Sequence, residues 1–504
     1  MKIALVEPPK YVSPTNHVST VATPPLGLAY VAATLEAGGH RVSVVDAIGS
    51  GLSTYTKFGP VYLRGLTHEQ VVERIPADVD AIGVGCMFSC QWLATRELLA
   101  QIKKRFGNIP LILGGEHATG LTELSMAQAP IDVVVLGEGE EIFLDLVTAL
   151  GAGGSLADIA GIAYRAEDGI RVNPRRNRIR DIDEIPPPAW HLFDLEAYMA
   201  HNQPHGAARG RFMPMLATRG CPYECTFCTS PNMWTQRWIA RDPLKVVDEM
   251  ESYMARYRAC DFQFEDLTAI VRKDWVQAFC REILRRNLTI SWQLPSGTRS
   301  EAIDLETCQL MKAAGCHEFA YAPESGSVRT LKLIKKRVAL DKLYQSARYA
   351  MESGINVGCF FILGFPHETW SDVLQTYKAI AKCALYGFST VNVNAFSPQP
   401  NTESYRALVA AGTITLNDEY FWGLFTFQDL FGKKKSYNPH FSDWTLTIAI
   451  VFGYCIFFGF SFLCRPWRIV TTLLDVFSPR SHTKLGRYLR GLLSDIDRAV
   501  SPRA

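Results

Sequence analysis

Residues 217–228 read ATRGCPYECTFC and carry three cysteines, Cys221, Cys225 and Cys228, in the spacing C-x3-C-x2-C. Thiolates are soft ligands that suit iron–sulfur clusters, and a cluster that only transfers electrons normally takes four cysteines. Three cysteines would leave one iron of a [4Fe–4S] cluster open. An open iron can bind the amino and carboxylate groups of S-adenosylmethionine (SAM), and an electron from the reduced cluster can then cleave the sulfonium. The motif therefore predicts a four-iron cluster that starts radical chemistry.

Two other interpretations of the motif stay open. A structural zinc needs four ligands. His201 or His205 could supply the fourth, although no second CxxC pair follows the motif. The three cysteines could also be neighbours by chance.

The stretch around the motif, residues 211–410, alternates strand and helix patterns. The strand candidates are FMPMLAT, DFQFED, ISWQLPS, EFAYAPE, GCFFILG and TVNVNAF, and amphipathic stretches such as PLKVVDEMESYMARY lie between them. Regular βα repetition of this length predicts a full or partial βα barrel whose chemistry lies on loops at the carboxyl ends of the strands. The cysteines follow the first of these strands.

Residues 1–150 alternate in the same way. The short apolar runs KIALVEP, HRVSVVDA, AIGVGCM, PLILGG and DVVVLG are each followed by turn residues, which predicts an α/β domain with a doubly wound, Rossmann-like parallel sheet. Ligands of such sheets bind beyond the carboxyl ends of the strands. Small residues at those ends let a large planar ligand approach the backbone. The ends are Glu7-Pro8-Pro9, Asp46-Ala47, Gly85-Cys86-Met87, Gly114-Gly115-Glu116-His117 and Gly137-Glu138-Gly139-Glu140.

The remaining segments differ from these two. Residues 151–210 predict a connector, with a hairpin-like stretch (IAGIAYRAEDGIRVNP) and a proline cluster that ends at Pro188. Residues 411–504 predict a mainly helical C-terminal region. Within it, residues 444–464 (WTLTIAIVFGYCIFFGFSFLC) carry no charge and reach the ~20 residues that a membrane-spanning helix needs.

This apolar segment supports two interpretations. In one, it spans or lies on a membrane, with association through residues 444–475 and basic residues at 433–435, Arg465 and Arg468 on its flanks. In the other, it is a buried helix that covers the barrel. The apolar C-terminal region also hints at a lipid or tetrapyrrole substrate, although an apolar lid would have the same composition.

Composition argues against several classes of protein. The 52 basic residues are balanced by 50 acidic ones, so net charge gives no reason to expect nucleic acid as a partner. Most of the 13 cysteines stand alone in apolar surroundings, which favours a reducing cytosol over a disulfide scaffold. The N-terminus MKIALVEPPK lacks the basic start, apolar core and cleavage site of a signal peptide. We therefore expect a cytoplasmic protein, with membrane association as the open question.

The cysteine motif and the residues that follow it resemble the radical SAM superfamily over most of residues 210–410. The resemblance implies that Phe227 packs near the adenine of SAM, and it places an acidic strand end at FQFED (Phe262–Asp266). Residues 323–327 (PESGS) resemble an element that contacts SAM, here through Glu324 and its neighbour Ser325. Residues 364–369 (GFPHET) resemble a turn near the adenine that begins at Gly364.

Residues 1–150 resemble the cobalamin-binding domain that precedes many radical SAM cores. The resemblance rests on the stretches Pro24-Pro25-Leu26-Gly27, Gly114–Thr119 and Gly137–Glu140. It implies that cobalamin contacts Pro24, Gly27, Asp46, Gly114, Gly115, His117, Gly137 and Glu138.

One departure concerns the axial ligand of cobalt. Many cobalamin proteins supply a histidine from a D-x-H-x-x-G loop after the first strand, whereas this chain has Glu7-Pro8-Pro9-Lys10-Tyr11-Val12-Ser13 there. Either cobalamin binds without a protein imidazole, or the domain no longer binds it. His17 and His117 are near the expected site, and we expect hydrogen-bonding roles for them rather than cobalt ligation.

The combined architecture is similar to the group that contains anaerobic magnesium-protoporphyrin IX monomethyl ester cyclase, hopanoid methylases and other radical SAM methylases. It implies an enzyme with a [4Fe–4S] cluster, SAM and cobalamin, served by a reductant protein such as flavodoxin or ferredoxin. The implied reaction is methylation of an unactivated carbon, from which a 5′-deoxyadenosyl radical has removed hydrogen, in a hydrophobic or cyclic small molecule. Oxidative cyclisation of a porphyrin side chain and a non-catalytic corrinoid or iron–sulfur sensor are the alternatives. The sequence assigns no catalytic residue.

Overall fold

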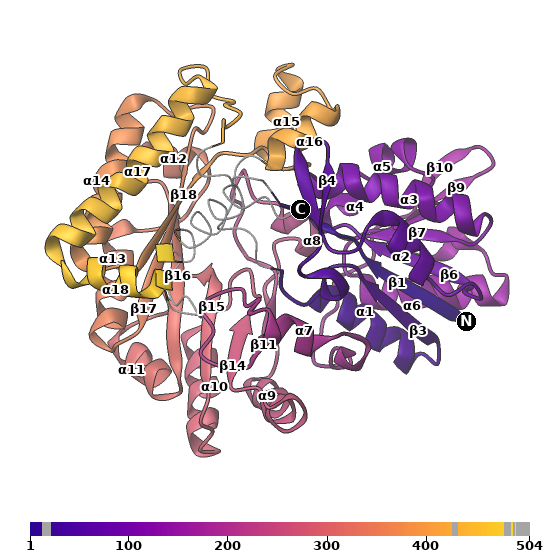
Figure 1. Ribbon diagram of the computed structural model, residues 1–504, viewed down its shortest axis with the longest axis horizontal. Coiled ribbons are helices and arrows are strands. Elements are labelled where there is room, and N and C mark those ends of the chain that lie inside the picture. The colour runs from indigo at the N-terminus through magenta and orange to yellow at the C-terminus, as the bar shows by residue number, and fades with distance from the viewer. Residues whose placement is uncertain (13–21, 426–431, 478–484, 487–488, 490–504) are drawn as a thin grey trace, which may run out of the picture.

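Two sheets built from βα units form the body of the molecule, one in each half of the view in Figure 1. The computed structural model of the chain describes residues 1–12, 22–425, 432–477, 485–486 and 489. The first sheet has the strand order β10-β9-β8-β7-β6-β1-β3. Its strands are β1 (Lys2–Glu7), β3 (Arg41–Asp46), β6 (Ala81–Gly85), β7 (Leu111–Gly114), β8 (Val133–Val135), β9 (Ile162–Ala166) and β10 (Gly169–Val172).

Helices cover both faces of this sheet, which is why its strands are apolar on both sides. In β1, Ile3 and Leu5 pack into one core with α1 and α6, while Ala4 and Val6 pack into another with α2 and α3. The helices of this half are α1 (Leu26–Ala37), α2 (His68–Arg74), α3 (Trp92–Phe106), α4 (Glu116–Gly120), α5 (Thr122–Gln128) and α6 (Gly139–Ala152). The expected doubly wound α/β fold is confirmed.

Two additions extend this half. The hairpin β9–β10, which lies in the stretch expected as a connector, pairs antiparallel with β8 and so belongs to the first sheet. A separate three-stranded antiparallel sheet is formed by β2 (Lys10–Val12), β5 (Val61–Arg64) and β4 (Tyr55–Phe58). The rest of the connector holds the α-helix α7 (Leu195–Ala200), preceded by a 3-10 turn at Trp190–Leu192, and crosses to the second half.

The second sheet is a six-stranded parallel sheet in which sequential strands are neighbours. Its strands are β11 (Phe212–Met215), β14 (Asp261–Phe264), β15 (Ser291–Thr298), β16 (Cys316–Glu324), β17 (Asn356–Leu363) and β18 (Thr390–Ala395). Among the residues described, β11 and β18 do not pair with each other. The sheet is therefore a partial barrel with an open side.

Helices pack on the outside of this partial barrel around its largest hydrophobic core (Figure 1). They are α9 (Pro243–Tyr257), α10 (Lys273–Arg285), α11 (Leu305–Ala313), α13 (Leu340–Glu352) and α14 (Trp370–Tyr386). The short helix α12 (Val328–Leu333) instead contributes Leu331 to a core that includes residues of the first half. The cysteine loop lies between β12 (Thr218–Arg219) and its antiparallel partner β13 (Ile239–Ala240), and it contains the short helix α8 (Ser230–Trp234).

The C-terminal region is helical where the structure describes it. Helices α15 (Glu403–Ala410) and α16 (Asp418–Phe425) lie against the first half, where Arg96 forms a bidentate ion pair with Asp418 at 2.8 and 2.9 Å. Helix α17 (Asp443–Cys464) packs against α14 and β18, and α18 (Trp467–Phe477) follows it. Within the described residues, α17 alone is long and apolar enough to cross a membrane.

Candidate functional site

One cavity of about 1410 Å³ lies between the two sheets. Residues at the carboxyl ends of the first sheet, such as Met87 and Gly114, line one part of it, and Cys228 and Glu265 of the barrel line another. Sites for a single small molecule typically measure about 300–1,000 Å³. The cavity therefore has room for more than one bound group.

The three cysteines of the motif lie on the loop after β12, and each is a free, partly exposed thiol. Among the described residues, no three His, Cys, Asp or Glu side chains converge closely enough to hold a single metal ion. Zinc ligation would need such convergence, whereas each cysteine of a cluster binds a different iron. The arrangement is therefore compatible with a cluster.

The two histidines considered as a fourth zinc ligand make other contacts. His205 pairs with Glu265 at 2.7 Å. The two ring nitrogens of His201 contact the Ala197 carbonyl at 2.9 Å and the Ser53 hydroxyl at 3.1 Å. None of these contacts of the two histidines is to a cysteine of the motif.

Burial raises the pKa of two thiols of the motif, those of Cys225 and Cys228. It raises the pKa of Cys228 to about 12. Burial also raises the pKa of Cys225, while the positive charge of the nearby Lys336 ammonium lowers it. Cysteines bind metal as thiolates, so iron must displace the protons. Three partly exposed thiols on one loop, with the Lys336 ammonium near two of them, fit a [4Fe–4S] cluster as its donor set.

Asp266 braces the strand that leads into the cysteine loop. Its carboxylate accepts hydrogen bonds from the Thr218 backbone N–H (2.5 Å), the Thr218 hydroxyl (2.6 Å) and the Ala217 N–H (3.2 Å). Burial raises its pKa to about 6. Asp266 does not line the cavity, whereas its neighbour Glu265 does. One Glu265 oxygen pairs with His205, and the other is buried without a hydrogen-bond partner in the described part of the chain.

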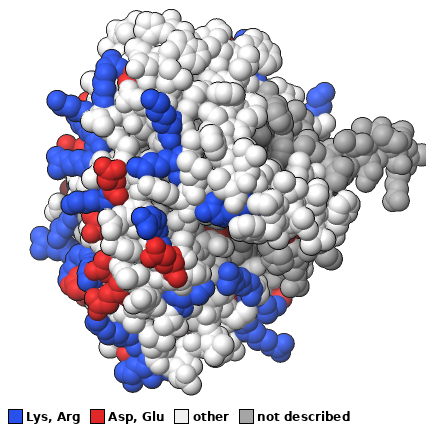
Figure 2. Space-filling view, turned by 90° about the vertical axis from the view of Figure 1, so that its left-hand side faces the viewer, with Lys and Arg blue, Asp and Glu red and all other residues white. Residues whose placement is uncertain are grey.

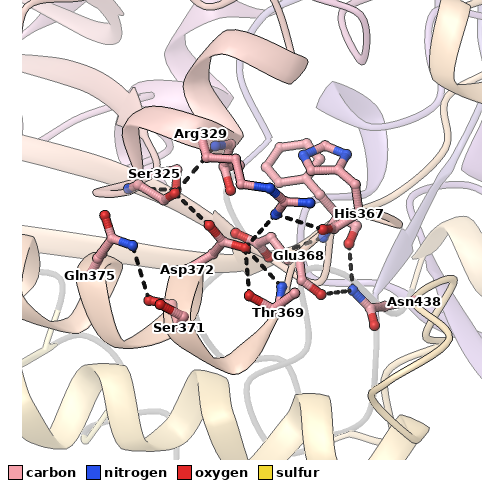
Figure 3. A network of polar contacts seen from close by, with 12 residues as sticks. Ser325, Arg329, His367, Glu368, Thr369, Ser371, Asp372, Gln375 and Asn438 are labelled. Atoms are coloured by element: carbon pink, nitrogen blue, oxygen red, sulfur yellow. Dashed lines mark hydrogen bonds and ion pairs between the residues drawn. The ribbon is translucent and has the colours of Figure 1, made fainter.

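The two elements expected near SAM are joined by one polar network (Figure 3). Asp372, at the start of α14, accepts hydrogen bonds from the Ser327 hydroxyl (2.6 Å), the Thr369 hydroxyl (2.8 Å) and Arg329 (2.7 Å). Ser325 is fully buried, and its hydroxyl contacts that of Thr376 at 3.1 Å. Ser325 therefore ties the end of β16 to helix α14.

Glu324 lies beside the cysteine loop, and Phe227 is part of that loop. Glu324 pairs with Lys336 at 2.9 Å, and both residues act electrostatically on the Cys225 thiol. Phe227 packs edge-to-face on Phe365, at 5.5 Å between ring centroids, and Phe365 directly follows Gly364. The structure thus brings Phe227 and the turn at Gly364 together, although neither residue lines the large cavity.

Glycines at the edge of the first sheet leave room beside the backbone. A Cβ added at Gly27 or Gly114 would meet no atom within 4 Å, and both glycines line the cavity together with Pro24 and Gly137. At Gly115, φ is 114° and a Cβ would lie 2.4 Å from the Cys86 carbonyl oxygen, so only glycine is accommodated. These open backbone positions fit a large planar group such as cobalamin.

Two residues expected to contact cobalamin lie outside the cavity. Asp46 accepts hydrogen bonds from the N–H groups of Ile48 and Gly49 and from the Tyr198 hydroxyl at 2.8 Å, so it braces a loop. His117 is fully buried, and its ring nitrogens contact the hydroxyls of Ser89 and Ser125. Burial lowers the pKa of His117 to about 3, so the ring is neutral. His17 lies outside the described residues.

A buried arginine–glutamate node, made of Arg178, Arg219, Glu138 and Glu140, joins the two halves next to the cysteine loop. Arg219 lies two residues before Cys221 and pairs with Glu138 at 3.2 Å and Glu140 at 2.5 Å. Arg178, from the connector, pairs with Glu138 at 2.6 Å. Glu138 thus lines the cavity with its carboxylate already engaged.

Sequence reasoning missed several residues that line the cavity. Phe88, after β6, and Leu267, after β14, are exposed apolar side chains that border it. Met87 also borders it, at a strand end where the sequence already predicted a ligand. An apolar residue just beyond a strand end was the signal available in the sequence. Helices α17 and α18 also contribute, through Ile450, Tyr454, Phe458, Phe462, Trp467 and Thr471.

Comparison with known proteins agrees with this geometry. Residues 215–380 match the Radical SAM superfamily, and residues 13–147 match the B12 binding domain. The chain is 30% identical to an uncharacterized methyltransferase of Pyrococcus horikoshii over 98% of each chain. It is 31% identical to the anaerobic magnesium-protoporphyrin IX monomethyl ester cyclase of Rubrivivax gelatinosus, over 70% of this chain and 61% of the cyclase.

A solved structure shows the same arrangement of domains. The radical S-adenosylmethionine methyltransferase TsrM of Kitasatospora setae, with cobalamin and a [4Fe–4S] cluster bound, superposes with a TM-score of 0.63 at 19% identity. The match covers 81% of this chain and 75% of that one. The chain belongs to the radical SAM superfamily, to the group of enzymes that carry a B12-binding domain ahead of the radical SAM domain and use a [4Fe–4S] cluster, SAM and cobalamin.

Proposed function

We propose that the chain methylates an unactivated carbon of a hydrophobic or cyclic small molecule. The supporting observation is the single cavity that borders both the cysteine loop and the glycine-rich edge of the first sheet. SAM and cobalamin would act one after the other on the same substrate carbon, so both must reach it. This is possible here because the carboxyl ends of both sheets face the same cavity.

In this proposal the residues divide into three groups. Cys221, Cys225 and Cys228 hold the cluster; Phe227, Glu324, Ser325 and Gly364 form or support the SAM site; and Pro24, Gly27, Gly114, Gly115, Gly137 and Glu138 border cobalamin. When bound, the cluster would supply the electron that cleaves SAM, and cobalamin would carry the methyl group. The apolar lining of Met87, Phe88 and Leu267 would keep water from a carbon-centred radical.

Methylation is favoured over the cyclase alternative by the extent of the likeness. The likeness to a methyltransferase spans 98% of the chain, whereas the likeness to the cyclase spans 70% and leaves part of its own length unmatched. The intact cysteine trio argues against a non-catalytic sensor. We further propose a cytoplasmic enzyme that receives electrons from a flavodoxin or ferredoxin and contacts a membrane through residues 444–475.

Anaerobic reconstitution tests this function. The protein, loaded with iron, sulfide and cobalamin, is given a strong reductant, SAM labelled in its methyl group, and an extract of host cells as the substrate source. We expect 5′-deoxyadenosine and a labelled product heavier by one methyl group. Cys225→Ser should abolish both, and Cys464→Ser, at an exposed cysteine, should abolish neither.

Other outcomes separate the alternatives. 5′-Deoxyadenosine without a labelled product would contradict methylation and favour the cyclase reaction. No SAM cleavage by a fully loaded protein would favour the sensor.

A further inference from the structure

Helix α17 presents apolar side chains to two opposite environments. Ile450, Tyr454 and Phe458 follow one another at helical spacing and line the cavity. Ile448, Phe452 and Leu463 lie on the opposite side and are exposed, Ile448 by 66% and Leu463 by 80%. An α-helix is ~10 Å thick. A single helix thus separates the reaction cavity from an apolar outer surface.

The outer surface continues onto α18 and α14. Val470, Leu474 and Phe477 of α18 are exposed, and so are Trp370 and Leu374 of α14. Helices α14 and α17 lie side by side, with Trp370 against Phe441 and Tyr377 against Phe452. We call this surface, formed by exposed residues of α14, α17 and α18, the apolar face. Surfaces of this kind on soluble proteins mark contact with a partner or a membrane.

Burial excludes the two simplest explanations of the apolar sequence. A helix of a soluble core would be mostly buried, yet only 39% of the most apolar stretch of α17 is buried. A helix that crosses a bilayer would be free to face lipid all round. Here Leu446, Ile450 and Phe457 are buried against the barrel, so α17 is part of its wall.

Charge and aromatic residues favour a bilayer surface as the occupant of this face. Residues 444–474 contain no Asp or Glu. Of the cations beside the helix, Lys433 pairs with Asp443, and Arg465 and Arg468 donate to backbone carbonyls between residues 384 and 388. An apolar face without exposed acidic residues meets an anionic lipid surface without repulsion, and the exposed Lys435 complements it. Trp444 and Trp467, at the two ends of the helix, are exposed by 58% and 60%, and tryptophan favours the boundary between lipid and water. Figure 2 shows a broad area free of charged side chains on this side of the molecule.

We propose that the apolar face docks on the surface of a lipid bilayer and that the substrate is an apolar molecule taken from that bilayer. Trp467 carries the second part of the inference, because it is exposed on the face and also lines the cavity. The open side of the partial barrel lies along β18, the strand that α17 packs against. A membrane-resident molecule would therefore pass Trp467 to reach the cavity. This inference rests on the proposed methylation and specifies its substrate class.

Flotation with vesicles of phosphatidylcholine and phosphatidylglycerol tests the docking on the reconstituted full-length protein. We expect wild-type protein to float with the vesicles, and I448E/L463E to partition at least about tenfold more weakly, since two apolar contacts with lipid are replaced by charges. Both positions are exposed, so the variant should fold. Val172→Glu is the matched control, because Val172 is 51% exposed on β10, in the other half of the molecule. It should float as the wild type does.

Two results would overturn the docking: wild-type protein that stays in the soluble fraction, or I448E/L463E that floats equally well. A wild-type dimer that the same variant converts to a monomer, without flotation, would show that a second copy covers the face.

The substrate class has its own measurement. The organic-solvent and aqueous extracts of host cells are offered separately with methyl-labelled SAM. Label in an apolar product supports the inference, and label only in water-soluble products overturns it. Absence of any label would count against the proposed methylation itself, while flotation would still decide the docking.

Discussion

At the scale of single residues, Glu368 ties one turn together through a buried carboxyl. Its Oε2 accepts hydrogen bonds from the N–H groups of Gly364 (2.7 Å) and Phe365 (3.1 Å), and Oε1 is buried with no hydrogen-bond partner among the described residues. Burial raises the pKa of Glu368 from 4.5 to about 8. The folded protein therefore holds a proton here that the unfolded chain has released at neutral pH.

This difference predicts a pH dependence of stability. A raised folded-state pKa gives a stabilising contribution that is complete below about pH 4.5 and is lost as pH rises through about 8. Between about pH 5.5 and pH 9, wild-type apoprotein should lose up to a few kcal/mol more unfolding free energy than Glu368→Gln, since one pKa unit corresponds to about 1.4 kcal/mol. Urea unfolding of both proteins at both pH values measures the difference. Equal losses would show that Glu368 is ionised in the folded protein.

The cysteines were predictable because chemistry fixes both their type and their spacing. The acidic pair in FQFED was only half predictable. Phe262 and Phe264 are buried in the barrel core, so alternation along a strand places Glu265 on the opposite side, toward the cavity. Asp266 follows the strand and turns back to Thr218, and no local pattern signals a contact with a residue so far away in the sequence.

At the scale of elements, the alternation of strands and helices was readable, whereas the role of α17 was not. Periodicity identifies a helix with one buried face. Helix α17 is apolar on all sides because it meets the barrel, the cavity and the exterior in turn. A membrane-spanning helix and a helix in a barrel wall can have the same apolar composition. Only the tertiary contacts distinguish the two.

Helix α17 also provides a hydrogen-bond acceptor for one backbone N–H of the edge strand β18. The Val393 backbone N–H donates to the Tyr454 hydroxyl at 3.1 Å. Tyr454→Phe should destabilise the protein by about 1–3 kcal/mol, because a buried N–H would lose its partner. Chemical unfolding gives the magnitude, and hydrogen exchange should show faster exchange at Val393. Tyr386→Phe, at a partly exposed tyrosine, should change neither. An unchanged exchange rate at Val393 in Tyr454→Phe would show that the hydroxyl does not protect the strand.

At the scale of the whole molecule, the arginine–glutamate node defined above joins the two halves. Its residues are distant in the sequence, and each charge alone would be typical of a solvated loop, so no sequence pattern could have predicted it. In the structure, Arg219 is 4% exposed and lies over the rings of Tyr30 and Trp234. The node thus fixes the cysteine loop against the end of the first sheet.

Removal of Arg219 should therefore cost more than removal of a partly exposed ion pair that links the first half to the C-terminal region. Arg219→Met leaves Glu140 buried without its cation, and we expect a loss of about 3 kcal/mol. Arg96→Met removes the partly exposed pair with Asp418 and should cost at most about 1 kcal/mol. Thermal unfolding of the apoproteins compares the two. Arg219→Met/Glu140→Gln should recover part of the loss; no recovery would mean that the arginine acts through packing alone.

The cavity wall has three sources in the chain: the strand ends of the first sheet, the loops of the barrel, and the helix pair α17–α18. The third source is separate in sequence from both stretches expected to hold the cofactors. Related enzymes could thus diverge in what they modify by changing residues 443–477 while the radical-generating parts stay constant. A chimera that carries this helix pair from a relative would inherit the relative's choice of molecule and keep its own cofactor sites.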